Sequence, residues 1–266
     1  MEKIVMKISG EALKDSNSSI SEEKLDIVYQ SIKTLLDNNK SLILITGGGN
    51  IWRGRSHKNM DDNTKDSIGM LATVMNSLAL RDYLTKNNIK SYLCGSFLIE
   101  GIVPKYNKEE CLEHLNNNEV IIISGGVGLP FTTTDFACVQ RALELKADYL
   151  LMGKNIDGIY DKDPKKYKDA VKYDELTFES FLDIQIKNGL SNQGVIDVNA
   201  LSLLCAHKLK TILYKIDDKD AIKKIINKEK VGTIIKEQQN VLFYLTESKN
   251  FAILKNDFYK KGVAEK

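Results

Sequence analysis

The 266-residue sequence is poor in the residues that build disulfide-bonded, metal-centred or membrane-spanning proteins. Its four cysteines lie far apart without a CxxC pair and its three histidines do not cluster, so we expect reduced thiols and no structural zinc site. No apolar run approaches the roughly 18 residues that a membrane span requires. The N-terminus begins with a short strand pattern rather than a cleavable signal. These absences predict a cytoplasmic protein that has no membrane partner.

An excess of one charge sign is also missing. Apolar residues at 42% and charged residues at 28% are typical of a globular protein with a buried core. Lysine and arginine together number 38, and aspartate and glutamate number 36, which leaves a net charge of +2. A protein built to bind the nucleic-acid backbone carries a strong basic bias. We therefore expect no nucleic acid among the partners.

What the sequence does contain is a regular alternation of short apolar runs and amphipathic segments. We expect strands at residues 4–8, 41–46, 90–93, 120–124, 149–152, 211–214 and 231–235, and helices at residues 22–36, 68–84, 109–115, 136–145 and 195–206. Such alternation is typical of βαβ units, and strands that are apolar throughout indicate a parallel sheet covered on both faces. The sequence predicts an α/β fold: a three-layer αβα sandwich with a mostly parallel central sheet, over residues 1–235.

The last part of the chain, residues 236–266, differs in character. It has two short apolar runs separated by polar residues, followed by a charged end. We expect a C-terminal extension with a hairpin and a charged tail, and we assign it no role.

Three glycine-rich corners follow predicted strands, and we name them by their order in the chain. The first corner is KISGEAL at residues 7–13, the second is GGGNIWRG at 47–54, and the third is SGGVGLPFTTTD at 124–135. Glycines let a ligand approach the backbone, and a following helix start offers free N–H groups and a positive dipole end. Lys7 and Arg53 add cations. Because no corner fits the P-loop or dinucleotide fingerprints, they predict a phosphate-binding site of another kind.

Asp135 ends the third corner, and its residue context allows two roles. It follows threonines and precedes an amphipathic run, which is typical of a helix N-cap. Its carboxylate can also orient lysines around a phosphate, and the two roles are compatible. No second carboxylate or nucleophile accompanies it, so the chemistry would rest on positioning and charge rather than on a covalent intermediate.

The three corners, together with two further stretches, resemble the amino acid kinase superfamily and, within it, the bacterial-type uridylate (UMP) kinases. The further stretches are GMLATVMNSLALRD at residues 69–82 and DGIYDKDP at residues 157–164, and the resemblance covers about residues 3–235. It implies an amino acid kinase-like fold and transfer of the ATP γ-phosphate to UMP, giving UDP and ADP in pyrimidine nucleotide biosynthesis. It further implies Mg²⁺ carried by the ATP phosphates, with no metal ligands from the protein, and a homohexamer.

The same resemblance assigns roles to individual residues. Catalytic residues would be Lys7, Arg53 and Asp135. ATP would be bound by Lys7, Ile8, Ser9, Gly10, Gly49, Arg53, Lys154, Tyr160 and Asp163. UMP would be bound by Gly48, Asp66, Val127, Gly128, Leu129, Pro130, Phe131, Thr132, Thr133 and Thr134.

Two alternatives share this fold. One is a kinase with another small acceptor, such as an acylglutamate or a carbamate, against which Asp66 and residues 69–82 argue. The other is a regulatory or storage protein that binds nucleotides without turnover, which would not need Lys7, Arg53 and Asp135 in catalytic register. Val127 and Leu129 stand where UMP kinases commonly have threonine and asparagine. We still expect UMP to be preferred over CMP, and these two residues would relax that choice only if side chains, rather than backbone groups, read the edge of the base.

Overall fold

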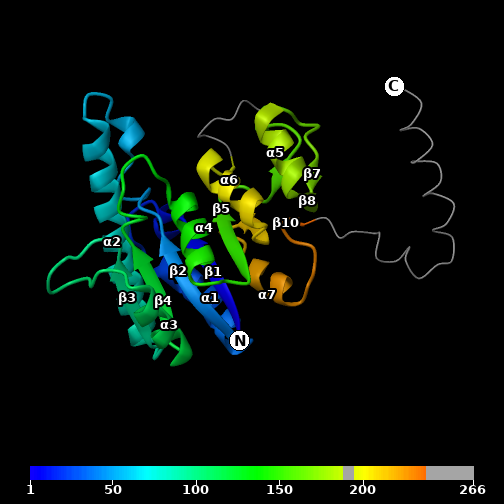
Figure 1. Ribbon diagram of the computed structural model, residues 1–266. Helices are drawn as coiled ribbons and strands as arrows, with labels where there is room; N and C mark the ends of the chain where they lie inside the picture. The colour runs from blue at the N-terminus through cyan, green and yellow to red at the C-terminus, as the bar shows by residue number, and fades with distance from the viewer. Residues whose placement is uncertain (188–194, 238–266) are drawn as a thin grey trace, which may run out of the picture. The chain divides into compact units, whose positions relative to one another are not determined.

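The computed structural model describes residues 1–187 and 195–237 of the chain (Figure 1). Their centre is an eight-stranded sheet with the order β3-β4-β2-β1-β5-β9-β10-β8. The strands are β1 Glu2–Ile8, β2 Lys40–Thr46, β3 Ser91–Gly95, β4 Val120–Ser124, β5 Tyr149–Lys154, β8 Glu175–Thr177, β9 Thr211–Lys215 and β10 Thr233–Lys236. Strand β10 runs antiparallel to β9, and the other pairs are parallel. From residue 238 on, the predicted C-terminal extension lies outside the described residues.

Helices cover both faces of this sheet because each strand is apolar on both sides. In β1, Ile4, Met6 and Ile8 belong to one buried cluster, whereas Val5 belongs to the other. The first cluster packs against α1 Glu22–Asp37, α2 Asp62–Lys86 and α7 Ala221–Ile226, and the second packs against α3 Lys108–Asn116, α4 Thr134–Glu144, α5 Phe178–Lys187 and α6 Val198–His207. The predicted three-layer fold with a mostly parallel sheet is confirmed.

Several boundaries differ from the prediction because capping side chains decide them. Helix α2 begins at Asp62, before the predicted residue 68, since the Asp61 carboxylate accepts a bond from the Thr64 N–H at 2.9 Å. Helix α6 begins only at Val198, after Asp197 caps its first turn. Helices α5 and α7, strand β8 and the small hairpin of β6 Ile159–Tyr160 with β7 Lys172–Tyr173 were not predicted. These elements are short, and packing against the larger core stabilises them.

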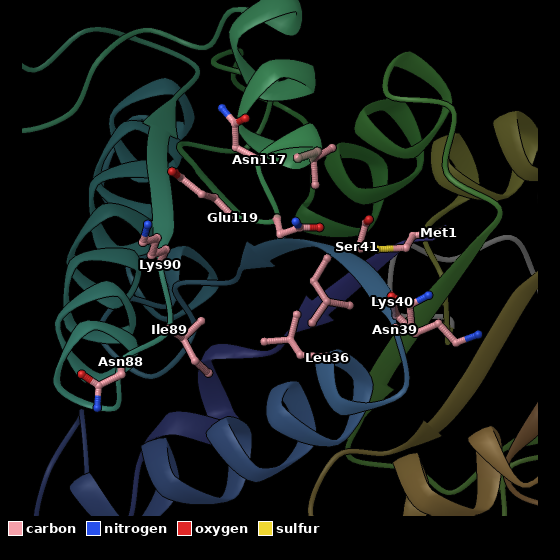
Figure 2. A pocket seen from close by; sticks show the side chains of 13 residues that line it. Met1, Leu36, Asn39, Lys40, Ser41, Asn88, Ile89, Lys90, Asn117 and Glu119 are labelled. Atoms are coloured by element: carbon pink, nitrogen blue, oxygen red, sulfur yellow. The ribbon is translucent and has the colours of Figure 1, made fainter.

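Three helix-to-strand turns repeat at the N-terminal edge of the sheet. Asn39, Asn88 and Asn118 have φ values of 58°, 60° and 59° and lead into β2, β3 and β4. Asparagine tolerates this left-handed conformation better than most residues do. The three turns line a cavity of about 580 Å³ together with Lys40, Lys90 and other residues (Figure 2). The cavity lies at the opposite ends of these strands from the glycine corners, so we do not assign the predicted chemistry to it.

Candidate functional site

The three glycine corners meet at the C-terminal ends of neighbouring strands, because β1, β2 and β4 lie side by side in the sheet. The Gly47 N–H donates to the carbonyl of Ile8 at 2.8 Å, which joins the second corner to the first. A Cβ atom on Gly10 would lie 2.7 Å from the Gly49 nitrogen, and one on Gly48 would lie 2.8 Å from the Gly69 carbonyl oxygen. Side chains at these positions would force the backbones apart. The corners therefore form one site, at the edge where α/β proteins bind ligands.

A buried charge centre lies beside the corners. Both carboxylate oxygens of Asp135 accept a lysine: Lys7 donates to Oδ1 and Lys154 to Oδ2, each at 2.5 Å. Strands β1 and β5 are adjacent, with Lys7 paired in register with Met152, and the first turn of α4 places Asp135 over them. The expected N-cap role of Asp135 is wrong, since Thr133 caps α4 by accepting from the Phe136 N–H at 3.1 Å. Asp135 is thus left to bind the two lysines.

Burial and charge act against each other on the pKa values in this centre. Burial would raise the pKa of Asp135, but the two ammonium groups lower it to about 2. Burial, together with repulsion from Lys7, lowers the pKa of Lys154 to about 8 despite the attraction of Asp135. For Lys7, burial opposes protonation but the ion pair with Asp135 prevails and raises its pKa. At neutral pH two cations share one anion, which leaves a net positive charge for a phosphate.

The lowered pKa of Lys154 makes a testable contribution to stability. Between its folded pKa of about 8 and the ordinary lysine value of 10.5, the folded protein binds fewer protons than the unfolded chain, so this group makes the free energy of unfolding rise with pH. Below pH 8 Lys154 is charged in the folded protein, and the free-energy cost of burying that charge beside Lys7 is fully present. We expect Lys154→Met to melt at a higher temperature than the unliganded wild type at pH 7, and the advantage to shrink by pH 10. Thermal melts of both proteins across this range test it; a less stable variant with an unchanged pH slope would contradict it.

Arg53 is held at the mouth of the site by a residue that sequence reasoning missed. Its guanidinium forms an ion pair with Glu11, and its Nε donates to the carbonyl of Gly49 at 3.2 Å. Glu11 also pairs with Lys14 at 2.8 Å. Burial opposes ionisation of Glu11, but hydrogen bonds from Lys14 and Arg53 lower its pKa. Glu11 lies within the first corner, and its place between Lys7 and Lys14 in the sequence was the available signal.

A second cavity, of about 220 Å³, opens beside the second and third corners. Of the residues expected at UMP, it is lined by Gly48, Asp66, Leu129, Thr132, Thr133 and Thr134. It is also lined by Gly49, which was expected at ATP, and by residues that had no predicted role, namely Trp52, Gly54, Lys65, Gly69, Met70, Thr73 and Gly126. We name it the acceptor cavity, after the residues expected at the acceptor that line it. The structure thus gathers segments that are far apart in the chain around one hollow.

The backbone of the third corner is fixed by side chains from other segments. The hydroxyl of Thr73 in α2 accepts a bond from the Gly125 N–H at 2.7 Å. Ser96, which follows β3, donates to the carbonyl of Gly126 at 2.6 Å. Gly125 and Gly126 have φ values of 75° and 60°, which favour glycine. Thr73 and Ser96 were not predicted, since only the folded chain brings them to this loop.

Two carboxylates hold the later part of the same corner. The Phe131 N–H donates to Oδ2 of Asp66 at 2.6 Å, and Phe131 has a φ of 61°, which is strained for a bulky side chain. The hydroxyl of Thr133 donates to Asp197, which also caps α6. The loop between the glycines and α4 is therefore pre-shaped at the rim of the acceptor cavity.

The remaining candidates lie at several places around the corners. Ile8 is buried at the end of β1, and Ser9 precedes the short 3₁₀ helix Gly10–Leu13. The Tyr160 hydroxyl donates to Asp157 at 2.8 Å on the β6–β7 hairpin. Asp163 lies in the loop between β6 and β7. Val127, Gly128 and Pro130 lie in the third corner, between β4 and α4, but they are not among the residues that line the acceptor cavity. Their roles toward nucleotides stay predictions.

The part of the chain that the structure describes contains no group of three or more histidine, cysteine, aspartate or glutamate side chains placed to hold a metal ion. Asp135, the buried carboxylate of the site, already binds a lysine through each oxygen. Within residues 1–187 and 195–237, no helix is both long and apolar enough to cross a membrane.

Comparison with known proteins agrees with this geometry. A model of the amino acid kinase family matches residues 2–215. The uridylate kinase of Malacoplasma penetrans is 38% identical over 244 residues, which are 91% of this chain and 74% of that protein. The crystal structure of UMP kinase from Bacillus anthracis has a TM-score of 0.83 and 31% identity, covering 90% of this chain and 97% of that one. The crystal structure of UMP kinase from Ureaplasma parvum has a TM-score of 0.81 and 32% identity, covering 89% of this chain and 99% of that one.

Proposed function

The chain belongs to the amino acid kinase family and, within it, to the uridylate kinases, and on this premise we propose that it transfers the γ-phosphate of ATP to UMP, giving UDP and ADP. The observation that carries the proposal is the Lys7–Asp135–Lys154 centre at the meeting point of three glycine corners, next to the acceptor cavity. A regulatory or storage protein without turnover is disfavoured, because a binder has no need of two lysines buried around one carboxylate.

Phosphoryl transfer asks the protein for positioning and for neutralisation of charge on the phosphate oxygens. Lys7 is the group best placed to meet the transferring phosphoryl, since it begins the first corner near the end of β1 and its ammonium binds Asp135 at the end of the third corner. Lys154, at the end of β5, would serve the donor side. With a pKa of about 2, Asp135 stays ionised and orients both ammonium groups rather than acting as a base. The second corner, with Gly48, Gly49 and Arg53, would lie between donor and acceptor.

We infer that magnesium enters with ATP, bound to its phosphates, since Asp135 has both oxygens engaged by lysines. The ion would supply further neutralisation of charge on the donor phosphates. Tyr160 and Asp163 would line the adenosine side.

On the acceptor side, the Asp66 carboxylate would bind the ribose hydroxyls, and Thr132 to Thr134 would serve the phosphate and base. Leu129 lines the acceptor cavity with an apolar side chain. Backbone groups of the third corner, rather than side chains at 127 and 129, would then read the uracil edge. We expect UMP to be preferred over CMP on that account.

A coupled assay of ADP release tests this proposal directly. The wild type is supplied with magnesium, ATP and, in turn, UMP, CMP, dUMP and AMP. We expect the highest kcat/KM with UMP and reduced turnover with dUMP, because Asp66 loses a hydroxyl partner. Equal turnover of UMP and CMP would show that Val127 and Leu129 relax base selection. No turnover with any of the four would refute the proposal.

We also propose that the enzyme works in the cytoplasm, in pyrimidine nucleotide biosynthesis, and as a homo-oligomer, with the hexamer of the family resemblance as the expected form. Leu71 and Met75 on α2 are 49% and 52% exposed, although they lie on a helix whose other face is buried. Two large apolar side chains one helical turn apart favour a subunit contact.

Met75→Asp is expected to lower the oligomeric mass, because a desolvated carboxylate at such a contact opposes association. Light scattering on the wild type and the variant measures this. An unchanged mass would place the contact elsewhere.

A further inference from the structure

Few charged side chains line the acceptor cavity. Of the described residues that line it, Lys65 alone carries a positive charge and Asp66 alone a negative one. Neighbouring cations are already paired with carboxylates: Arg53 is held by Glu11, and the two lysines of the charge centre are held by Asp135. An acceptor phosphate carries two negative charges and loses much hydration on binding, so a cation in the wall of this cavity would add to the surplus positive charge of the Lys7–Asp135–Lys154 centre.

Lys65 is built into the wall of the cavity rather than extended over the surface. Its side chain is 14% exposed. A Cβ atom on Gly54 would lie 3.1 Å from the Lys65 Cβ and 3.7 Å from its Cγ, so the stem passes over the second corner where that residue is a glycine. The Lys65 carbonyl also accepts the Trp52 indole N–H at 2.9 Å. Backbone and stem are thereby fixed, and the ammonium group is the part that can move.

The present partner of that ammonium is weakly held. Lys65 Nζ lies 2.7 Å from Oδ1 of Asp62, one turn earlier on α2, and the Asp62 side chain is 70% exposed. An ion pair with so exposed a carboxylate contributes little to stability. A cation at the start of a helix also opposes the helix dipole. The stability of the fold therefore does not explain why a lysine stands at this position.

We propose that Lys65 binds the phosphate of the acceptor nucleoside monophosphate, exchanging the Asp62 carboxylate for phosphate oxygens as the nucleotide enters the cavity. The inference rests on the proposed function, since it concerns the acceptor of that reaction. In this proposal Asp62 holds the ammonium until the nucleotide enters and competes with the substrate for it. A merely structural pair would behave differently, because loss of either partner would then have the same effect.

The two partners can be separated by opposite effects on KM. Lys65→Met is expected to raise the KM for UMP by about tenfold, the equivalent of one charge-assisted hydrogen bond, with the KM for ATP unchanged. Asp62→Asn is expected to lower the KM for UMP by about twofold, because it removes a competitor of exposed-pair strength. Lys65→Arg should retain most of the affinity.

Lys86→Met is the control on the same helix, since Lys86 pairs with Asp82 at the same 2.7 Å near the other end of α2, although its side chain is more exposed. It should leave both KM values unchanged. A Lys65→Met variant with wild-type KM for UMP, or an Asp62→Asn variant whose KM rises as in Lys65→Met, would overturn the inference. Calorimetric titration with UMP in the absence of ATP gives the same comparison without turnover. Failure of the wild type to phosphorylate UMP would instead refute the proposed function, so the two failures are distinguishable.

Discussion

Replacement of Lys7 by methionine is expected to lower kcat by about a thousandfold or more while the fold is retained. The ammonium group is the cation best placed to meet the transferring phosphoryl, and loss of one group that stabilises transition-state charge has an effect of about this size. Methionine keeps most of the length of the side chain without its charge, and Asp135 keeps its ion pair with Lys154 at 2.5 Å. Steady-state kinetics give the rate, and circular dichroism with a thermal melt gives the fold.

Lys3→Met is the matched control because Lys3 lies on the same strand, with its ammonium donating to the Leu145 carbonyl at 2.8 Å, away from the glycine corners. It removes an equal charge and should leave kcat close to that of the wild type. A Lys7→Met enzyme that keeps more than about a tenth of wild-type kcat would show that charge on the transferring group is neutralised elsewhere.

Asp135→Asn is expected to damage both stability and activity, since it leaves two lysines in a buried site without a counter-charge. Breaking a buried pair from one side costs about 3–5 kcal/mol, and in a chain of this size each kcal/mol lowers Tm by about 2–4 °C. Because the pKa of Lys154 is already only about 8, this lysine loses its proton readily in the variant and limits the cost. We therefore expect the lower end of that range, a fall in Tm of about 10 °C.

A double variant separates the two effects of Asp135. Asp135→Asn with Lys154→Met removes one surplus cation, so Tm should recover much of the loss while kcat stays low. In the wild type, the low pKa of Asp135, about 2, means that its stabilisation is present above the ordinary value of 3.8 and disappears as the pH falls toward 2. A single Asp135→Asn variant with wild-type Tm and kcat would show that the centre neither stabilises the fold nor aligns the lysines.

The edge of the sheet where the site forms was predictable from local patterns. Apolar strands that end in glycines and are followed by helices predict parallel strands whose C-terminal ends lie at one edge of the sheet. This places Lys7, Gly48 and the third corner together without any knowledge of distances. The order β4-β2-β1 was not predicted, since parallel strands in any order end at the same edge of the sheet.

The pairings within the site could not be predicted in the same way. That Lys154 shares the Asp135 carboxylate with Lys7 depends on how α4 packs across β1 and β5, which no local pattern encodes. The Glu11–Arg53 pair and the Thr73 bond to Gly125 likewise join residues that are 42 and 52 positions apart in the sequence, respectively. Polar partners of this kind are specified only once the core has fixed the backbone.

The transfer reaction itself is the central claim, and isotope transfer measures it most directly. The wild type is incubated with magnesium, UMP and ATP labelled in its γ-phosphate, and the products are separated by chromatography. The account predicts label in the β-phosphate of UDP, with one UDP formed for each ADP, and no such transfer by Lys7→Met. Label released as inorganic phosphate, or retained in ATP while UMP stays bound, would contradict it.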